Sequence, residues 1–287
     1  MEIFKEIGPI RAFLRSRKTG PVSIGFVPTM GALHEGHLRL IRTSRQQNDL
    51  TVCSIYVNPI QFNNPADLEK YPRTLAADIK LLEQENCDVL FVPSNDTMYS
   101  KPATVSFQFG TLDQTLEGAF RPGHFSGVAL VVAKLFNIVQ PTHAYFGQKD
   151  YQQFLIVSRL VDELQFDLQL HCEPTVREAD GLALSSRNQR LSAEGRKNAL
   201  ILFETLQNAR QQLTAGKSWP EVKQTAIEHI AQSGKAQLEY LALADRENLM
   251  EAENVTPQNL NNAILLVAAY VENVRLIDNL FVAYEKS

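Results

Sequence analysis

Residues 22–37, VSIGFVPTMGALHEGH, contain the strand-to-helix junction on which the predicted fold rests. The run at 22–27 is short, apolar and β-branched, and it ends at Pro28, which is typical of a buried strand. Apolar residues then recur with helical spacing over 37–48. Ligands of parallel sheets bind at the carboxyl ends of the strands. The turn PTMGALHEGH, at 28–37, is therefore the first candidate for a functional site.

The same alternation of strand and helix repeats along the chain. Further strands are expected at 51–57, 88–92, 104–109, 143–147 and 168–176, and further helices at 74–86, 128–139 and 152–164. Strands that alternate with helices form parallel sheets with helices on both faces. The sequence therefore predicts an α/β protein built on a Rossmann-like parallel sheet.

The pattern changes after about residue 180. A polar segment leads into two helices, the second at 219–233, and strands with turns are expected within 238–249 and 263–279. This mixture is typical of a smaller α+β domain. At ~150 residues per domain a chain of this length holds about two. We therefore expect a Rossmann-like domain at 1–176 and a C-terminal α+β domain at 177–287.

Composition and charge exclude several classes of protein. The 287 residues are 44% hydrophobic and 21% charged, and 28 Lys and Arg against 32 Asp and Glu give a net charge of −4. Such a chain has no general field for nucleic acid or anionic membranes. No apolar run reaches the length of a membrane span, and the N-terminus lacks the apolar run of a signal peptide. We expect a soluble protein of a reducing compartment, with no nucleic-acid or membrane partner.

The cysteines exclude several further kinds of site. Cys53, Cys87 and Cys172 include no CxxC pair, so a disulfide framework, a zinc ribbon and a dithiol redox site are not expected.

The candidate turn contains two histidines. His34 and His37 are three residues apart, so they share one face of the first helical turn. The N–H groups of a helix start hold phosphate, and two imidazoles there can stabilise charge on its oxygens. An isolated HxxH is more often two surface histidines. The spacing does not fit the HExxH zinc motif, and Gly25, Gly31 and Gly36 do not have the GxGxxG spacing.

Two other clusters could also bind phosphate. Lys149 and Asp150 follow the strand at 143–147 and could neutralise a phosphate and hold a ribose hydroxyl or a metal-bound water. Two hydroxyls and a guanidinium at 185–187 could grip a phosphate. Taken alone, the first cluster is better explained as an ordinary polar loop, and the second could be a common N-cap region with a surface arginine. The residues at 185–187 have no obvious core partner in the sequence pattern.

The remaining clusters could bind a small polar substrate. The segment 57–74 is long and rich in turn residues, as functional loops often are. Within it, Asn58 and Gln61 could bind the hydroxyls and carboxylate of such a substrate. Arg121 and His124 lie at a glycine-containing turn before the apolar helix.

Five blocks of sequence together resemble a known family. They are PTMGALHEGH (28–37), the region from YVNPIQF to YPRT (56–74), RPGHFSGV (121–128), YFGQKDYQQ (145–153) and READGLALSSRN (177–188). The HxGH turn resembles the nucleotidylyltransferase superfamily, which is related to class I aminoacyl-tRNA synthetases. The five blocks in order resemble the pantoate–β-alanine ligase family within it.

The resemblance implies a two-step reaction. ATP and (R)-pantoate give pantoyl adenylate and pyrophosphate, and β-alanine then attacks the acyl carbon to give pantothenate and AMP. It also implies Mg²⁺, a cytoplasmic homodimer and a role in coenzyme A biosynthesis. Two rival interpretations remain: another HxGH nucleotidylyltransferase, which should lack the amide loop around Gln61, and a non-catalytic RNA-binding relative. The net charge argues against the second.

The resemblance also assigns residues. It implies ATP binding by Met30, Gly31, Ala32, Leu33, His34, Glu35, Gly36, His37, Gly147, Gln148, Lys149, Asp150, Val176, Leu184, Ser185, Ser186 and Arg187. The catalytic candidates among them are His34, His37, Lys149 and Arg187. It assigns Gln61 and Gln153 to pantoate, Gln61 also to β-alanine, and Asp78 to Mg²⁺. Asn58, Arg121 and His124 complete the candidate substrate-binding set.

The chemistry agrees with these assignments. Adenylation gives a poorly electrophilic carboxylate a good leaving group. The transferring phosphate gains charge, so the site needs cations and fixed donors rather than a protein nucleophile. An acyl adenylate must also be kept from water, and we expect the loops at 61–74 and 178–190 to act as lids.

Overall fold

The computed structural model describes residues 1–18, 20–252 and 260–283. Contacts divide the chain into two compact units: unit 1 comprises residues 1–148 and 152–174, and unit 2 comprises residues 149–151 and 175–287. The break after residue 174 lies close to the expected boundary. The sequence pattern contains no signal that residues 149–151 group with unit 2.

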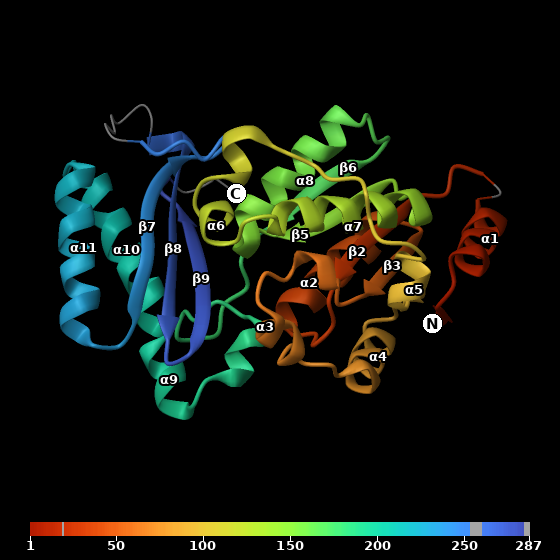
Figure 1. The fold of residues 1–287 in the computed structure, drawn as a ribbon, viewed down its shortest axis with the longest axis horizontal. Helices are drawn as coiled ribbons and strands as arrows, with labels where there is room; N and C mark the ends of the chain where they lie inside the picture. The colour runs from red at the N-terminus through yellow and green to blue at the C-terminus, as the bar shows by residue number, and fades with distance from the viewer. Residues whose placement is uncertain (19, 253–259, 284–287) are drawn as a thin grey trace. The chain divides into compact units, whose positions relative to one another are not determined.

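Unit 1 is built on a six-stranded parallel sheet with the order β1-β4-β3-β2-β5-β6. Its strands are β1 (Glu2–Phe4), β2 (Ile24–Thr29), β3 (Leu50–Ile55), β4 (Val89–Phe91), β5 (His143–Gly147) and β6 (Gln169–Glu173). The chain moves from β2 outward to β3 and β4 and then returns to β5 beside β2 (Figure 1). The turn after β2 therefore lies at the switch point of the sheet, where ligands of α/β proteins bind.

Helices cover both faces of this sheet. The longer ones are α1 (Ile7–Arg17), α2 (Glu35–Gln47), α4 (Leu75–Gln84), α7 (His124–Val139) and α8 (Tyr151–Glu163); the short ones are α3 (Pro65–Glu69), α5 (Asn95–Met98) and α6 (Glu117–Phe120). Adjacent strand residues point to opposite faces. Accordingly, Val27 packs in one cluster with Ile41 of α2 and Leu82 of α4, whereas Phe26 meets Phe136 of α7 edge-on. The predicted Rossmann-like sheet with helices on both faces is confirmed.

Two local differences separate this sheet from the one expected. The strand predicted at 104–109 is wrong: these residues are irregular, and the Phe107 N–H donates to the Ser126 hydroxyl instead of to a strand. The edge position beside β4 belongs to β1. Neither β1 nor α1 was predicted. A three-residue strand such as β1 is too short for a periodicity to be seen.

Unit 2 is an α+β structure, as expected. Its antiparallel sheet has the order β7-β8-β9, with β7 (Gln237–Asp245), β8 (Ala263–Val271) and β9 (Val274–Phe281). Its helices are α9 (Ala193–Asn198), α10 (Leu200–Thr214) and α11 (Trp219–Ser233). Helices α10 and α11 pack against each other and against the sheet (Figure 1). Leu206, Val222 and Leu265 lie in the core that these elements share.

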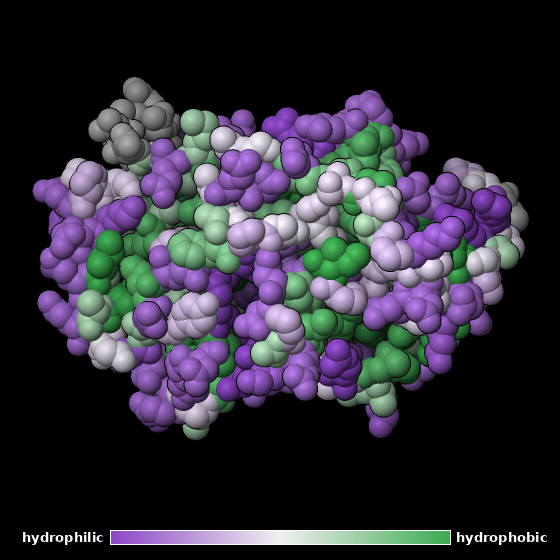
Figure 2. Space-filling view, viewed as in Figure 1, coloured by the Kyte–Doolittle hydropathy of each residue, from purple (hydrophilic) through white to green (hydrophobic). Residues whose placement is uncertain are grey.

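The surface is mixed in character. On the face shown in Figure 2, hydrophilic residues cover most of the area and apolar residues appear in small groups between them. Across the described ranges, no helix combines the length and the apolar character that crossing a bilayer requires.

Candidate active site

The turn that follows β2 is held by buried side chains. The Thr29 hydroxyl donates to the Ser54 carbonyl at 2.8 Å and accepts the Gly31 N–H at 3.2 Å. Gly31 has φ +81°, and a Cβ there would lie 3.0 Å from the Ile55 side chain and 3.1 Å from a carboxylate oxygen of Asp78. Glycine is therefore favoured at position 31 by its dihedral angle, and a side chain there would also be tightly packed.

The two histidines form the start of helix α2. His34 is the N-cap residue, and its Nδ1 accepts the Gly36 N–H at 3.2 Å. His37, three residues on, accepts the His34 N–H on its own Nδ1 at 3.3 Å. This is the reciprocal geometry of a capping box, here built from two imidazoles. The two ring centroids lie 4.1 Å apart, so the predicted sharing of one helical face is confirmed.

This capping geometry decides where each ring carries its proton. A ring nitrogen that accepts an N–H bond holds a lone pair, so the proton of the neutral ring sits on the other nitrogen. For His34 and His37 the acceptor is Nδ1, and Nε2 is therefore the N–H donor. Two such donors at a helix start, where the helix dipole is positive, suit the oxygens of a phosphate.

A second cluster in unit 1 brings together predicted substrate-binding residues. Asn58 donates from Nδ2 to Oε1 of Gln61 at 3.2 Å and to the Gly127 carbonyl at 3.1 Å. The Gln61 carbonyl lies 2.8 Å from Nδ1 of His124. All three side chains are buried, at 1%, 7% and 5% exposure. The cluster forms because α7 approaches closely: a Cβ on Gly127 would lie 2.9 Å from the Gln61 backbone.

Tyrosine hydroxyls fix the orientation of the amides in this cluster. Tyr99 donates to Oδ1 of Asn58 at 3.1 Å, and burial raises the pKa of Tyr99 to about 12. Burial also raises the pKa of Tyr56, which donates to Asn95 at 3.0 Å. Both hydroxyls therefore keep their protons near neutral pH. Because the amide oxygen of Gln61 faces Asn58, its Nε2 turns to the Met30 sulfur, at 3.1 Å.

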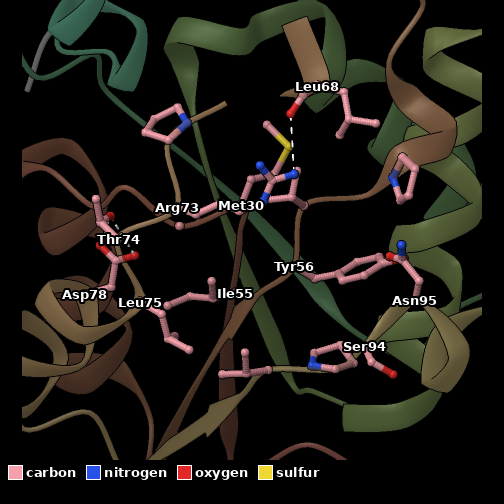
Figure 3. Close-up of a pocket in the computed structure, with 16 residues that line it drawn as sticks. Met30, Ile55, Tyr56, Leu68, Arg73, Thr74, Leu75, Asp78, Ser94 and Asn95 are labelled. Atoms are coloured by element: carbon pink, nitrogen blue, oxygen red, sulfur yellow. Dashed lines mark hydrogen bonds between the residues drawn. The ribbon is translucent and has the colours of Figure 1, made fainter. Parts of the chain in front are cut away.

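A cavity of about 490 Å³ in unit 1 opens beside the turn and the carboxyl ends of β3 and β4. Met30, Gly31 and Asp78 from the predicted site line it. Figure 3 shows Asp78 with Thr74 at one side of this cavity and Tyr56 with Asn95 at the other. Gln61 contributes no wall of this cavity and stays in the cluster with Asn58.

The other predicted substrate residues of unit 1 are held by different elements. Arg121 is 3.8 Å from the Glu117 carboxylate on the same helical stretch. Gln153 is half-buried at the start of α8. Its neighbour Gln152 is 3% exposed and bonds the Glu117 N–H and the Leu112 carbonyl. Glu117 thus contacts both Arg121 on its own helical stretch and Gln152 at the start of α8.

Unit 2 contains the predicted site residue Lys149 and the residues that bond the backbone next to it. The Lys149 ammonium lies 3.6 Å from the Asp150 carboxylate, and the Lys149 carbonyl accepts from Nδ2 of Asn279 at 2.9 Å. Next to Asn279, Asp278 pairs with both terminal nitrogens of Arg177, at 2.6 and 2.8 Å. Sequence reasoning missed Arg177, Asp278 and Asn279, because their partners are far apart in the chain.

The predicted phosphate-binding loop of unit 2 has a defined local structure. Val176 accepts the Leu184 N–H at 3.0 Å, and a 3-10 helix covers Ser186–Arg190. The Ser185 hydroxyl caps this helix by accepting the Arg187 N–H at 3.3 Å. Ser186 is only 7% exposed, although the sequence pattern shows no obvious core partner for residues 185–187.

Charged pairs hold the approach to this loop. Arg196 of α9 pairs with the carboxylates of Glu178 and Asp180. The hydrogen bond from Arg196 is the main cause that lowers the pKa of Asp180. These pairs are about one-third exposed.

The residues around Asp78 do not fit a direct magnesium site. Its two carboxylate oxygens accept the Ala32 N–H at 3.0 Å and the Leu33 N–H at 2.8 Å, and both lie 3.2 Å from the Thr74 hydroxyl. The side chain is 1% exposed, whereas Mg²⁺ in proteins usually keeps several waters. Within the described ranges, no group of three or more His, Cys, Asp and Glu residues could hold a metal.

Comparison with known proteins agrees with this arrangement. The family model described as pantoate-beta-alanine ligase matches residues 2–281. Pantothenate synthetase of Cytophaga hutchinsonii is 43% identical over 277 residues, covering 96% of this chain and 97% of that one. The corresponding protein of Thermotoga petrophila is 45% identical over 280 residues, covering 97% and 99%.

Solved structures agree as well. The crystal structure of pantothenate synthetase from Thermus thermophilus matches with a TM-score of 0.91 and 41% identity, covering 99% of this chain and 100% of that one. Pantoate-beta-alanine ligase from Francisella tularensis, complexed with beta-gamma ATP and beta-alanine, matches with a TM-score of 0.83 and 34% identity over the whole of both chains. This chain therefore belongs to the pantoate–β-alanine ligase family.

Proposed function

We propose that this protein condenses (R)-pantoate with β-alanine to form pantothenate, using ATP and passing through pantoyl adenylate. In the first step a pantoate carboxylate oxygen attacks the α-phosphorus, and the bond to the leaving pyrophosphate breaks. In the second step the amine of β-alanine attacks the acyl carbon, and the bond to AMP breaks. The observation that carries this proposal is the family match over residues 2–281, joined to the paired imidazoles at the start of α2.

ATP would bind with its phosphates at residues 30–37. The geometry of the capping box supports this placement, because Nε2 of His34 and of His37 is the protonated nitrogen. These donors, together with the helix start, are fixed before the substrate arrives. Preorganised donors stabilise the charge that develops on the transferring phosphate without reorganisation at the moment of reaction.

Pantoate would bind at Gln61, whose amide orientation supports the assignment. Asn58 occupies the oxygen of Gln61 and the Met30 sulfur accepts one hydrogen of its NH₂ group, so the second NH₂ hydrogen would face the ligand. An NH₂ donor suits the carboxylate and hydroxyl oxygens of pantoate. Asn58 and His124 support this amide and its backbone, and we assign Arg121 and Gln153 to the outer part of the same substrate site.

The other predicted ATP-binding residues come from the junction after β5 and from unit 2. We assign Gly147, Gln148, Lys149 and Asp150 to the ribose and phosphates, Val176 to the adenine, and Leu184–Arg187 to the triphosphate. Two cations among them, Lys149 and Arg187, offset the phosphate charge. On this assignment residues 1–176 bind the nucleotide and pantoate, and residues 177–287 supply the phosphate-gripping loop.

Three further features belong to this proposal. Magnesium would be carried by the phosphates of ATP, since both oxygens of Asp78 already accept backbone N–H bonds. We also propose that the protein acts in the cytoplasm and as a homodimer, with no nucleic-acid or membrane partner. The homodimer is tested by the mass of the particle in solution.

A pyrophosphate-release assay tests the reaction itself. With ATP and Mg²⁺, pyrophosphate should appear only when pantoate is added, and AMP should be released only when β-alanine follows. Pyrophosphate release that requires a nucleotide or a nucleotide-linked acceptor, and is indifferent to pantoate, would instead indicate another nucleotidylyltransferase.

A further inference from the structure

The Asp78 carboxylate joins helix α4 to the turn that presents the two histidines. It lies in the first turn of α4, and its two oxygens accept the N–H groups of two consecutive residues, Ala32 and Leu33. We propose that Asp78 is a positioning residue that sets the phosphate-facing turn at 31–37, and that it is not a ligand of the metal. This inference rests on the proposed function.

The backbone of the turn needs support from outside. Gly31 has φ +81° and Ala32 has φ +50°, so two successive residues are left-handed. Alanine gains no local hydrogen bond in that conformation and meets a steric penalty from its Cβ. A turn of this kind persists only where its surroundings hold it. The bonds to Asp78 begin at Ala32 itself.

The geometry of the carboxylate matches that need. Each oxygen takes one backbone N–H, at 3.0 and 2.8 Å, and the Thr74 hydroxyl lies 3.2 Å from both oxygens. Bonds from N–H groups to an ionised carboxylate are stronger than neutral ones. The residue after Leu33 is His34, the N-cap of α2. Asp78 therefore fixes the residue from which both imidazoles are oriented.

The same contacts exclude direct metal binding. The side chain is 1% exposed, and its oxygens point to backbone N–H groups, which repel a cation. Mg²⁺ requires near-octahedral oxygen ligands at short distances and retains several waters. A buried oxygen that already accepts a backbone N–H, with the Thr74 hydroxyl 3.2 Å away, cannot supply such a position without disrupting the turn.

The proposal is tested by measuring ATP affinity with and without metal. Calorimetric titration of Asp78→Asn with ATP, once in excess EDTA and once in excess Mg²⁺, compares the dissociation constants with those of the parent protein. The amide keeps the size but turns an NH₂ group toward backbone N–H donors. We expect weakening of about 10- to 100-fold, the usual scale for bonds to a charged group, and by the same factor in both conditions.

A weakening that appears only with Mg²⁺, or that disappears as Mg²⁺ is raised, would overturn the proposal and make Asp78 a metal ligand. Equal, undiminished affinity in both conditions would also overturn it. If the parent protein itself does not bind ATP, the proposed function fails first, and the two failures are thereby distinguished.

Two variants guard against a simple folding defect. Thr74→Val removes only the hydroxyl that supports Asp78 and lies on the surface, so it should fold and weaken ATP binding about threefold, again independently of metal. Asp88→Asn is the matched control: that carboxylate also accepts a backbone N–H, from Thr51 at 2.8 Å, but next to the amino end of β4. It should leave ATP affinity unchanged. If Asp78→Asn does not fold, the ATP affinity of Thr74→Val, measured with and without Mg²⁺, tests the proposal in its place.

Discussion

The turn at 29–37 in unit 1 and the segment at 177–190 in unit 2 carry the two groups of predicted phosphate-binding residues, yet different interactions hold them. The turn is fixed by buried groups, chiefly the Asp78 carboxylate and the Thr29 hydroxyl. The segment is fixed by charged pairs of its own, and those of Arg196 are about one-third exposed. Its pair of Arg177 with Asp278, by contrast, is largely buried.

This difference separates a turn held by buried bonds from a segment held partly by exposed ion pairs. Buried bonds to a carboxylate are insensitive to dissolved salt, whereas exposed ion pairs are screened and contribute little. Donors that must meet developing charge are best held rigidly. In the proposed function the segment at 177–190 admits ATP and releases pyrophosphate, so weaker support would make it adjustable. Substitutions in the turn should therefore have larger effects than substitutions in the segment.

Replacing His37 should have the largest effect. In His37→Ala the rate of adenylate formation should fall by at least ~10²-fold, the scale for losing one preorganised transition-state donor. The measurement is single-turnover pyrophosphate release with saturating ATP and pantoate. His37→Gln is the control for folding, because glutamine at the third helical position also accepts the N-cap N–H. His37→Gln should keep the thermal stability of the parent protein, but its rate of adenylate formation should stay low. Near-normal turnover in either variant would remove His37 from the mechanism.

Gln61 should affect one substrate and spare the other. Gln61→Ala removes the oriented NH₂ group and should raise the KM for pantoate by about 10-fold or more, while ATP affinity stays within about twofold. Gln61→Glu sharpens the test, since it keeps the acceptor for Asn58 but places a negative charge against the pantoate carboxylate. The KM of Gln61→Glu for pantoate should therefore be at least as high as that of Gln61→Ala. A collapse of ATP affinity with normal pantoate use would show that the two subsites have been exchanged.

Arg187 tests the adjustable segment. Arg187→Ala should slow adenylation by about 10-fold and leave β-alanine attack on preformed pantoyl adenylate nearly unchanged, because pyrophosphate has departed by then. Arg187→Lys keeps the charge without the planar fork. Its adenylation rate should lie between the rates of the parent protein and of Arg187→Ala. The measurement is single-turnover kinetics with and without preformed adenylate. Equal losses in both steps would point to a general role in covering the site.

Arg196 should give the smallest effect, visible mainly through pH. The hydrogen bond from Arg196 lowers the pKa of Asp180 below its ordinary value of 3.8. A carboxyl group with a lowered pKa in the folded state stabilises the fold above its unfolded pKa, and this stabilisation is lost as pH falls through the folded value. Arg196→Ala should thus lower the Tm slightly at pH 7, and the difference from the parent should shrink below about pH 4.

Lys197→Ala is the control for Arg196, because Lys197 is more exposed on the same helix and lies 4.0 Å from Glu194. It should show no such pH dependence. A Tm difference for Arg196→Ala that stays constant on acidification well below the ordinary Asp180 pKa would contradict the role of that carboxylate.

Local patterns predicted much of the fold and part of the site. Periodicity located the strands and helices around the sheet, and the three-residue spacing of His34 and His37 predicted that they share one helical face. Asn58 and Gln61 were proposed because they lie in a long, turn-rich loop, and the structure shows that they bond directly.

Long-range pairings were beyond such reasoning. Asp78 bonds to residues 45 and 46 positions earlier, and Arg177 to a residue 101 positions later. Nothing in the neighbourhood of either residue indicates its partner. The strand expected at 104–109 failed for a related reason, because alternation reports a half-buried segment and not whether a neighbouring strand is present to bond it.

The close approach of α7 at Gly127 bears on how the proposed pantoate site can change during evolution or redesign. Any side chain at that position would meet the backbone that carries Gln61, at 2.9 Å, and would have to displace it. Variants selected for a different acid should accordingly keep Gly127 and accumulate changes at flexible neighbours such as Met30, whose thioether can repack.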